Sequence, residues 1–548
     1  MHHHHHHATG TKAFDPEDLF SAETAGLMKA STPQVVRLND GDVFDLHIQP
    51  VTKWIDGNLV RMLAYNGSIP GPRLWVDQGS EITVRVQNDG DVEATVHWHG
   101  LRLENRYDGV PEETQAPIAI GGTYTYKVQF PDPGFYWYHP HIREDFAQEM
   151  GLYGTILVEP SDPSYWPAVD RQITITLDDV LIEGGRMAPF MRSGPSFTAM
   201  GRFGNVMLTN GETSFYEEAG AGEVVRLHLV NTANTRIFNF ALGGRRMKVV
   251  GGDSGRYEYE QFAEEVVISP SERVIVDVLF DGSGDVPLEH RTPDRVYRLG
   301  SITIAGRTTG AAAKSFGTLR TDPELSAERR RMEDQFGRSP DKVLSFVSEM
   351  PLLYGAETDA SAVYACPMHP EVTGSGPETC PKCGMKLVAT DSSESPAMGS
   401  DHHDHGTDES SDGLEWEDLM LEINRKTNPG NMIWKLIDRE TGLENGDIAW
   451  TFTVGDRVKI RLVNEMEGSD HPMHHPFHVH GAGRFLILSR DGRIEPNLVW
   501  KDTVLLRAGE VVDILLHITN PGLWMAHCHI AEHTESGMMF SFAVDERN

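Results

Sequence analysis

Ten histidines gather in four short clusters, and each cluster contains at least one His-x-His pair. On a β-strand, residues i and i+2 point to the same face, so each pair presents two imidazoles in one direction. One such pair is more often structural than metal-binding, but four in one chain indicate metal binding. The clusters are His97-Trp-His99, His139-Pro-His141, His475-Pro-Phe-His478-Val-His480 and His527-Cys528-His529, the last followed by His533 and Met538.

The last cluster indicates which metal is bound. Cys528 alternates with its two histidine neighbours, so one short strand can serve two metal sites on its two faces. Cys528, His533 and Met538, with one distant histidine, form the two-His, one-Cys set with an axial methionine that is typical of blue copper. Four cysteines in 548 residues cannot form a disulfide framework, which again favours metal chemistry.

A second group of soft ligands lies in a short segment with Cys-x₂-Cys spacing. Thiolates and thioethers favour Cu(I) or zinc, so a metal site is expected here. The alternative is a structural zinc knuckle that only orders the segment. The candidate ligands are Cys366, Met368, His369, Cys380, Cys383 and Met385.

The elements that must position these side chains are strands in an internal repeat. Three segments each combine a turn glycine, an alternating strand and a final asparagine: Gly79–Asn88, Gly222–Asn231 and Gly455–Asn464. Alternation with period two predicts half-buried strands, and therefore three similar β domains. Only the first and third copies continue into Pro-Gly followed by His-x-His. The middle domain is therefore predicted to be a spacer without copper ligands.

These repeats predict an all-β fold, with helical periodicity scarce outside the region around Pro323–Gln335. Residues 1–10 read as a purification tag and linker, and we expect the tag to have replaced a native signal peptide. The predicted domains are 30–160, 161–310 and 341–548, with a linker at 311–340. The third contains the metal module at 360–390 and an acidic, low-complexity segment with His and Met at 391–413.

Composition excludes several functions. The chain has 81 acidic and 48 basic residues and a net charge of −33, so we expect it to repel nucleic acid and anionic membranes. No run of 18 apolar residues is present, and no membrane span is expected.

Taken in order, the four histidine clusters resemble the four copper motifs of multicopper oxidases, with the domain spacing of a three-domain laccase-like member or cuprous oxidase. The resemblance covers about residues 35–310 and 415–545, and it implies three tandem cupredoxin domains, each a Greek-key β-sandwich or barrel. The cysteine-rich segment resembles the small heavy-metal-binding domain of copper and silver efflux proteins.

The resemblance also implies a set of ligands for four copper ions. The type 1 copper would take His475, Cys528, His533 and axial Met538, and the type 2 copper would take His97 and His478. One type 3 copper would take His99, His139 and His529, and the other His141, His480 and His527. A register starting at His471 would place the third ligand on Pro476, which cannot bind, so the motif starts at His475.

Water formation needs protons, and the family places an acid near the cluster at the position of Asp108, which could also be a plain turn residue before Gly109. A second acid often follows the last type 1 histidine, but Thr534 stands there. Glu532 and Glu535 are weak substitutes.

The implied reaction is oxidation of a substrate at the type 1 site, with His475, Cys528 and His533 in the electron path, coupled to reduction of O₂ to water. Cu(I) is the favoured substrate, for copper tolerance, and phenols are also expected. The alternatives are a general laccase with a passenger insert and a copper-sequestering protein. The implied location is the periplasm or cell exterior, and a monomer is favoured.

Overall fold

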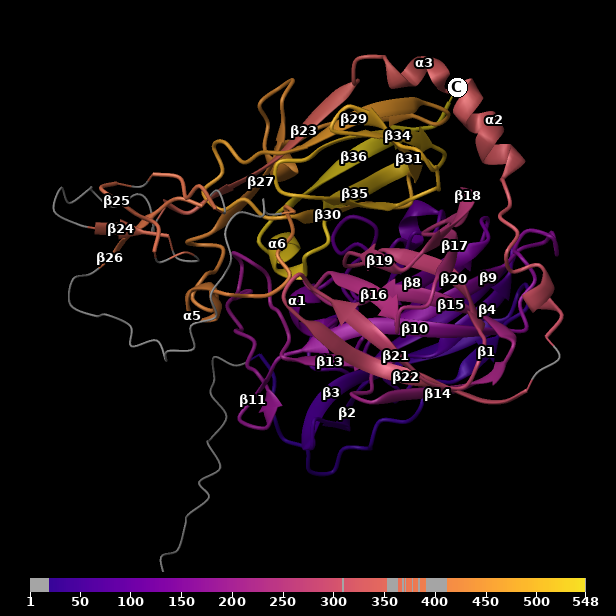
Figure 1. The fold of residues 1–548 in the computed structure, drawn as a ribbon. Helices are drawn as coiled ribbons and strands as arrows, with labels where there is room; N and C mark the ends of the chain where they lie inside the picture. Colours follow the sequence, from indigo (N-terminus) through magenta and orange to yellow (C-terminus); the bar gives the residue numbers. More distant parts are fainter. Residues whose placement is uncertain are drawn as a thin grey trace, which may run out of the picture.

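The computed structural model describes residues 19–307, 310–351, 363–366, 369, 371–376, 378–382, 385–390 and 412–547. The tag and linker predicted at 1–10, the candidate ligands Met368 and Cys383, and all but the last two residues of the acidic segment predicted at 391–413 lie outside the described residues. The all-β prediction is confirmed, because three β-sandwiches make up most of the chain (Figure 1).

The first sandwich packs a five-stranded sheet on a four-stranded sheet. Alternate residues of β5, Ile82, Val84 and Val86, are buried between the sheets, as the period-two pattern requires. The larger sheet has the order β1 (Val35–Arg37), β4 (Arg73–Asp77), β9 (Gly154–Glu159), β8 (Gly134–His139), β6 (His97–His99). The other has the order β3 (Asn58–Tyr65), β2 (Val43–Ile55), β5 (Glu81–Asn88), β7 (Thr123–Gln129).

The second sandwich has sheets of six and five strands, and it has a hydrophobic core of its own. The first order is β13 (Val206–Thr209), β10 (Arg171–Val180), β15 (Glu223–Asn231), β20 (Arg273–Phe280), β17 (Met247–Gly252), β18 (Gly255–Ala263). The second is β14 (Phe215–Ala221), β22 (Val296–Arg307), β21 (Gly284–Arg291), β16 (Phe238–Leu242), β19 (Glu265–Ile268), and β11 (Ile182–Glu183) pairs with β12 (Arg186–Met187) outside them.

The third sandwich also has sheets of six and five strands. The first order is β27 (Ile433–Asp438), β23 (Lys342–Glu349), β29 (Arg457–Asn464), β34 (Val511–Ile518), β31 (Gly483–Arg490), β32 (Arg493–Ile494). The second is β28 (Thr451–Thr453), β36 (Met539–Asp545), β35 (Gly522–Cys528), β30 (His475–Val479), β33 (Thr503–Leu506). The inserted segment forms a small sheet, β25 (Thr373–Gly374), β24 (Val363–Ala365), β26 (Val388–Thr390).

The three repeated segments occupy one topological position. β5, β15 and β29 each pair in parallel with a preceding strand, β2, β10 and β23 respectively, and antiparallel with a later one, β7, β20 and β34. The repeat seen in the sequence is therefore a repeat of the same central strand.

Helices are few and short. α2 (Pro323–Arg331) and α3 (Glu333–Phe336) lie in the predicted helical region, and Asp322 caps α2 by accepting from the Glu324 N–H at 2.8 Å. The other helices with bounds in the described part of the chain are α1 (Glu144–Ala147), α5 (Leu421–Asn424), α6 (Ala531–Glu535), and the 3₁₀ turns η1 (Asn105–Tyr107), η2 (Ala312–Lys314) and η3 (Asn445–Asp447). Among the described residues, no helix is long and apolar enough to cross a membrane.

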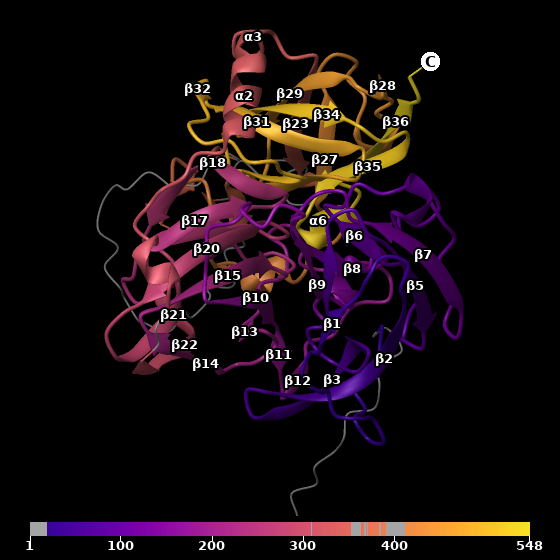
Figure 2. The ribbon, with the colours of Figure 1, turned by 90° about the vertical axis from the view of Figure 1, so that its right-hand side faces the viewer.

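The third sandwich lies across the first and second, so each sandwich contacts the other two (Figures 1 and 2). α6 of the third sandwich packs against α1 of the first. The inserted sheet β24–β26 projects to one side of the third sandwich (Figure 1).

Candidate metal centres

The histidine clusters lie on strand ends that meet at the contact between the first and third sandwiches. In the first, β6 pairs with β8 so that His97 lies opposite His139. In the third, β30 pairs with β35 so that His478 lies opposite His527 and Phe477 opposite Cys528. These strands bring all eight predicted cluster histidines into one buried group: His97, His99, His139, His141, His478, His480, His527 and His529.

The eight rings contact one another across the two sandwiches. His99 stacks on His478 with ring centroids 3.8 Å apart, and His97 lies 4.1 Å from His480. Among the groups whose nitrogen atoms lie within 4.8 Å of one another, three consist of these histidines, and the last of the three below is one of the two predicted type 3 sets. The groups are His97, His99 and His139; His97, His478 and His480; and His141, His480 and His527. His529 joins them through ring contacts with His99 at 5.0 Å and His139 at 5.2 Å.

The hydrogen bonds of these rings indicate that a metal ion belongs among them. His97, His139 and His478 each donate Nδ1–H to a backbone carbonyl at 2.8–2.9 Å, and Nε2 has no partner among the described residues. For His99 the order is reversed, because Nε2 donates to Asp502 at 3.0 Å and Nδ1 has no described partner. A buried nitrogen without a hydrogen-bond partner is unfavourable in free energy. In a metal-binding histidine one ring nitrogen donates a hydrogen bond to the protein and the other binds the metal, which is the arrangement seen here.

Burial also favours the form that binds metal. Burial, with the neighbouring imidazoles, holds the pKa of His99, His139 and His141 well below the ordinary histidine value. The rings are therefore neutral at physiological pH, and neutral imidazole is the metal ligand.

A second group surrounds Cys528 on the opposite face of β35. The thiol Sγ lies 3.4 Å from His475 Nδ1 and 3.6 Å from His533 Nδ1, and all three side chains are buried. The Met538 carbonyl accepts from the Cys528 N–H at 3.1 Å, so the methionine lies beside the group and is fully buried. Trp434 covers it with its ring 4.1 Å from that of His533. The ligand atoms of three predicted type 1 ligands, His475, Cys528 and His533, are thus brought together, with Met538 in backbone contact with Cys528.

Asp108 lies between the two sandwiches in contact with the histidine group. Its Oδ2 accepts from His480 Nδ1 at 2.7 Å, and its Oδ1 lies 3.4 Å from His97 Nδ1. Burial alone would raise the pKa of Asp108, but His480 and His97 lower it below its ordinary value. The carboxylate is therefore charged and joins one histidine of each sandwich.

The two proposed substitutes for an acid at Thr534 point elsewhere. Glu532 accepts from Thr235 of the second sandwich at 3.1 Å, and burial raises its pKa to about 8. Glu535 accepts from the Glu144 backbone N–H at 2.9 Å. Thr534 itself lies with Oγ1 3.2 Å from His527 Nδ1.

Three residues near the histidines were missed by sequence reasoning. Glu144 Oε1 lies 3.1 Å from His141 Nδ1, and the spacing of three after a ligand histidine was a usable signal. Asp502 accepts from His99, and Arg273 of the second sandwich donates to Asp502 at 2.7 Å. That pair is 229 residues apart, and no sequence pattern connects it.

In the inserted segment, Cys366, His369 and Cys380 form a third candidate group. His369 Nδ1 lies 3.7 Å from Cys366 Sγ and 3.6 Å from Cys380 Sγ. Met385 instead packs into the core of the third sandwich, in the same buried cluster as Met538. Of the six predicted insert ligands, three are thus brought together and one is directed to the core.

A cavity of about 380 Å³ lies between part of the insert and the third sandwich. Cys380 and Lys382 line one side, and Met473 and His474 line the other. His474 immediately precedes the candidate ligand His475, accepts at Nδ1 from the Glu415 N–H at 3.2 Å, and has no described partner at Nε2. His471 is also buried, and burial lowers its pKa to about 4.

Comparison with known proteins relates three parts of the chain to described families. Two profiles described as "Multicopper oxidase" match residues 47–163 and 419–548, and one described as "Heavy metal binding domain" matches 363–390. Laccase-5 of Arabidopsis thaliana is 26% identical, covering 89% of each chain. Multicopper oxidase MmcO of Mycobacterium tuberculosis is 26% identical over 89% of this chain and 84% of its own.

Solved structures share the fold. A laccase-like multicopper oxidase, CueO, from Ochrobactrum sp. superposes with a TM-score of 0.66 at 22% identity, covering 94% of this chain and all of its own. A metallo-oxidase from Campylobacter jejuni gives 0.63 at 20% identity over 96% of this chain and all of its own. The predictions of family, cupredoxin fold and oxidoreductase class are confirmed. The chain belongs to the multicopper oxidase family and carries an inserted heavy-metal-binding domain.

Proposed function

We propose that this oxidase takes single electrons from Cu(I) at a type 1 site and delivers them to O₂ at a trinuclear site. The type 1 ligands would be His475, Cys528, His533 and Met538. The type 2 ligands would be His97 and His478, and the type 3 sets His99, His139, His529 and His141, His480, His527. Four copper ions, when bound, would supply the redox chemistry that the side chains lack.

The chain itself would provide the path for the electrons and a site from which bulk water is excluded. Cys528, the last residue of β35, is bonded through the backbone to His527 before it and to His529 after it, so the two candidate sites share a covalent connection. The cluster histidines are almost entirely buried, which excludes bulk water from them. Asp108 would hold His97 and His480 in the orientation that presents Nε2 inward.

Cu(I) is favoured over a phenol by the cavity between the insert and the third sandwich. Cys380 lines it on the side of the insert, and Met473 and His474 line it beside the type 1 ligand His475. Thiolate, thioether and imidazole are the ligands that Cu(I) prefers. Lys386 anchors the insert at this place by donating to Asp470 at 2.5 Å. This substrate suggests a role in copper tolerance and a location outside the cytoplasm.

Removing or altering the insert tests whether it supports the oxidation of Cu(I). A variant lacking residues 364–412, bridged by a short Gly/Ser linker, should oxidise Cu(I) more slowly at limiting Cu(I), while phenol oxidation is unchanged or faster. Cys366→Ser combined with Cys380→Ser should reproduce the loss in the full-length chain. Lys382→Gln is the matched control, because it changes a cavity-lining side chain without removing a candidate ligand.

Two outcomes favour other functions. Unchanged Cu(I) and phenol rates in the deletion and the double variant would make the insert a passenger and the protein a general laccase. Copper binding without turnover on either substrate would favour copper sequestration. If the deletion variant does not fold, the double serine variant alone decides between these readings.

A further inference from the structure

A buried guanidinium of the second sandwich contacts all three sandwiches beside the histidine cluster. Arg273, the first residue of β20, donates Nη1–H and Nη2–H to the two carboxylate oxygens of Asp502 at 2.7 and 2.5 Å. Its Nε–H donates to the carbonyl of Phe135, in β8 of the first sandwich, at 3.0 Å. Both charged side chains are at most 2% exposed.

Asp502 in turn accepts hydrogen bonds from two candidate copper ligands. Its Oδ1 accepts from His99 Nε2 at 3.0 Å, and its backbone carbonyl accepts from His478 Nδ1 at 2.9 Å. Thr503 adds to both contacts, because its Oγ1 lies 3.3 Å from His99 Nε2 and 3.2 Å from His478 Nδ1. The two rings held in this way stack on each other with their centroids 3.8 Å apart.

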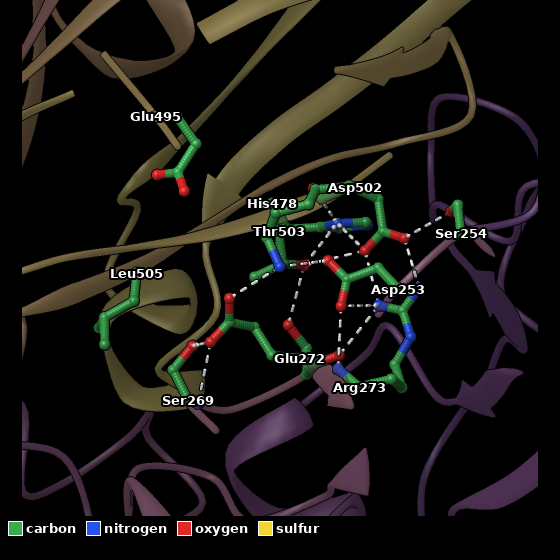
Figure 3. A network of polar contacts seen from close by, with 12 residues as sticks. Asp253, Ser254, Ser269, Glu272, Arg273, His478, Glu495, Asp502, Thr503 and Leu505 are labelled. Carbon is green, nitrogen blue, oxygen red and sulfur yellow. Dashed lines mark hydrogen bonds and ion pairs between the residues drawn. The ribbon is translucent and has the colours of Figure 1, made fainter. Parts of the chain in front are cut away.

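Two carboxylates stabilise the charged form of the buried Arg273. Asp253, also in the second sandwich, accepts from the Arg273 backbone N–H at 2.9 Å (Figure 3). It also forms an ion pair with Lys501 at 3.0 Å. Burial would lower the pKa of Arg273, but Asp502 and Asp253 raise it above its ordinary value. Removing the guanidinium would leave the buried Asp502 carboxylate without its ion-pair partner and no longer held toward His99.

We propose that Arg273 is a positioning residue of the trinuclear centre, which fixes the orientation of His99 and His478 through Asp502. The inference rests on the proposed assignment of those histidines as copper ligands. The middle sandwich contributes no candidate ligand, yet it sets the direction in which two ligands from the other sandwiches point. It is therefore more than the spacer that the sequence predicts.

The test compares two buried arginines of the same sandwich. Arg226 makes a similar bidentate pair with Asp277 at 2.7 and 2.9 Å, but it has no contact with the histidine cluster among the described residues. Arg273→Lys and Arg226→Lys each keep the charge and lose the two-pronged geometry. Copper retention under a chelator, the type 2 electron paramagnetic resonance signal and the blue absorption are measured on each holoenzyme.

Arg273→Lys should lose type 2 copper about 10–100-fold more readily, the range found for removal of a partner of a metal ligand, with an altered type 2 signal and an unchanged blue band. Arg226→Lys should keep both signals. The proposal is overturned if Arg273→Lys retains wild-type signals, or if both variants change alike. If the copper-loaded wild-type protein shows neither the blue band nor the type 2 signal, the ligand assignment itself is rejected.

If Arg273→Lys does not fold, the double variant Arg273→Met with Asp502→Asn removes both charges at similar volume. Its asparagine oxygen can still accept from His99 but is no longer held by a guanidinium. A type 2 signal that differs from that of Asp502→Asn alone supports positioning by Arg273, and a signal equal to that of Asp502→Asn overturns it.

Discussion

Replacing Gly109 by alanine should destabilise the protein and disturb the copper cluster together. Gly109 follows Asp108 and has φ +84°, and a Cβ there would overlap the Val96 carbonyl group and lie 2.9 Å from the His97 backbone nitrogen. The left-handed backbone costs an alanine about 1–2 kcal/mol. Relieving the overlap requires a backbone shift, for which about 1–3 kcal/mol is typical of overpacked sites. The two costs together come to roughly 2–5 kcal/mol.

Gly79 of the same sandwich separates the two costs. Its φ is +90°, and a Cβ there would meet no described atom within 4 Å, so Gly79→Ala should cost only the first part, about 1–2 kcal/mol. Thermal unfolding of both holoenzymes measures the difference, at about 2–4 °C per kcal/mol for domains of this size. Type 2 copper content measures the displacement of His97. Equal melting temperatures and equal copper content in the two variants would refute the reasoning.

Two further substitutions separate the proposed sites. Cys528→Ser should abolish the intense thiolate-to-copper absorption while copper stays largely bound among the histidines; a wild-type blue band would contradict the type 1 assignment. His478→Ala should leave the blue colour and remove steady turnover, as followed by oxygen uptake; wild-type uptake would contradict the division of labour between the two sites.

The ligand clusters were predictable because a strand alternates with period two. His97 and His99, or His527 and His529, point the same way on any strand, and Cys528 between them must point the other way. The repeated central strands β5, β15 and β29 carry the same regular signal. These features are local, so spacing in the sequence is enough to find them.

Asp502 and Arg273, which hold His99, were not predictable, because their contacts come from the packing of the sandwiches and not from spacing in the sequence. Arg273 reaches Asp502 only because the second and third sandwiches pack together, and no periodicity records a contact between distant segments. The same holds for Glu532, whose place near the cluster in sequence suggested a role there. Its side chain turns instead to Thr235 of the second sandwich.

The ratio of substrate oxidised to oxygen consumed tests the central claim most directly. It can be measured with a one-electron donor, an oxygen electrode and a peroxide assay on the copper-loaded, full-length protein. Cluster and type 1 site acting together should give four donor molecules oxidised for each O₂, with no hydrogen peroxide. A ratio of two with stoichiometric peroxide would contradict the proposed reduction of O₂ to water at a trinuclear site.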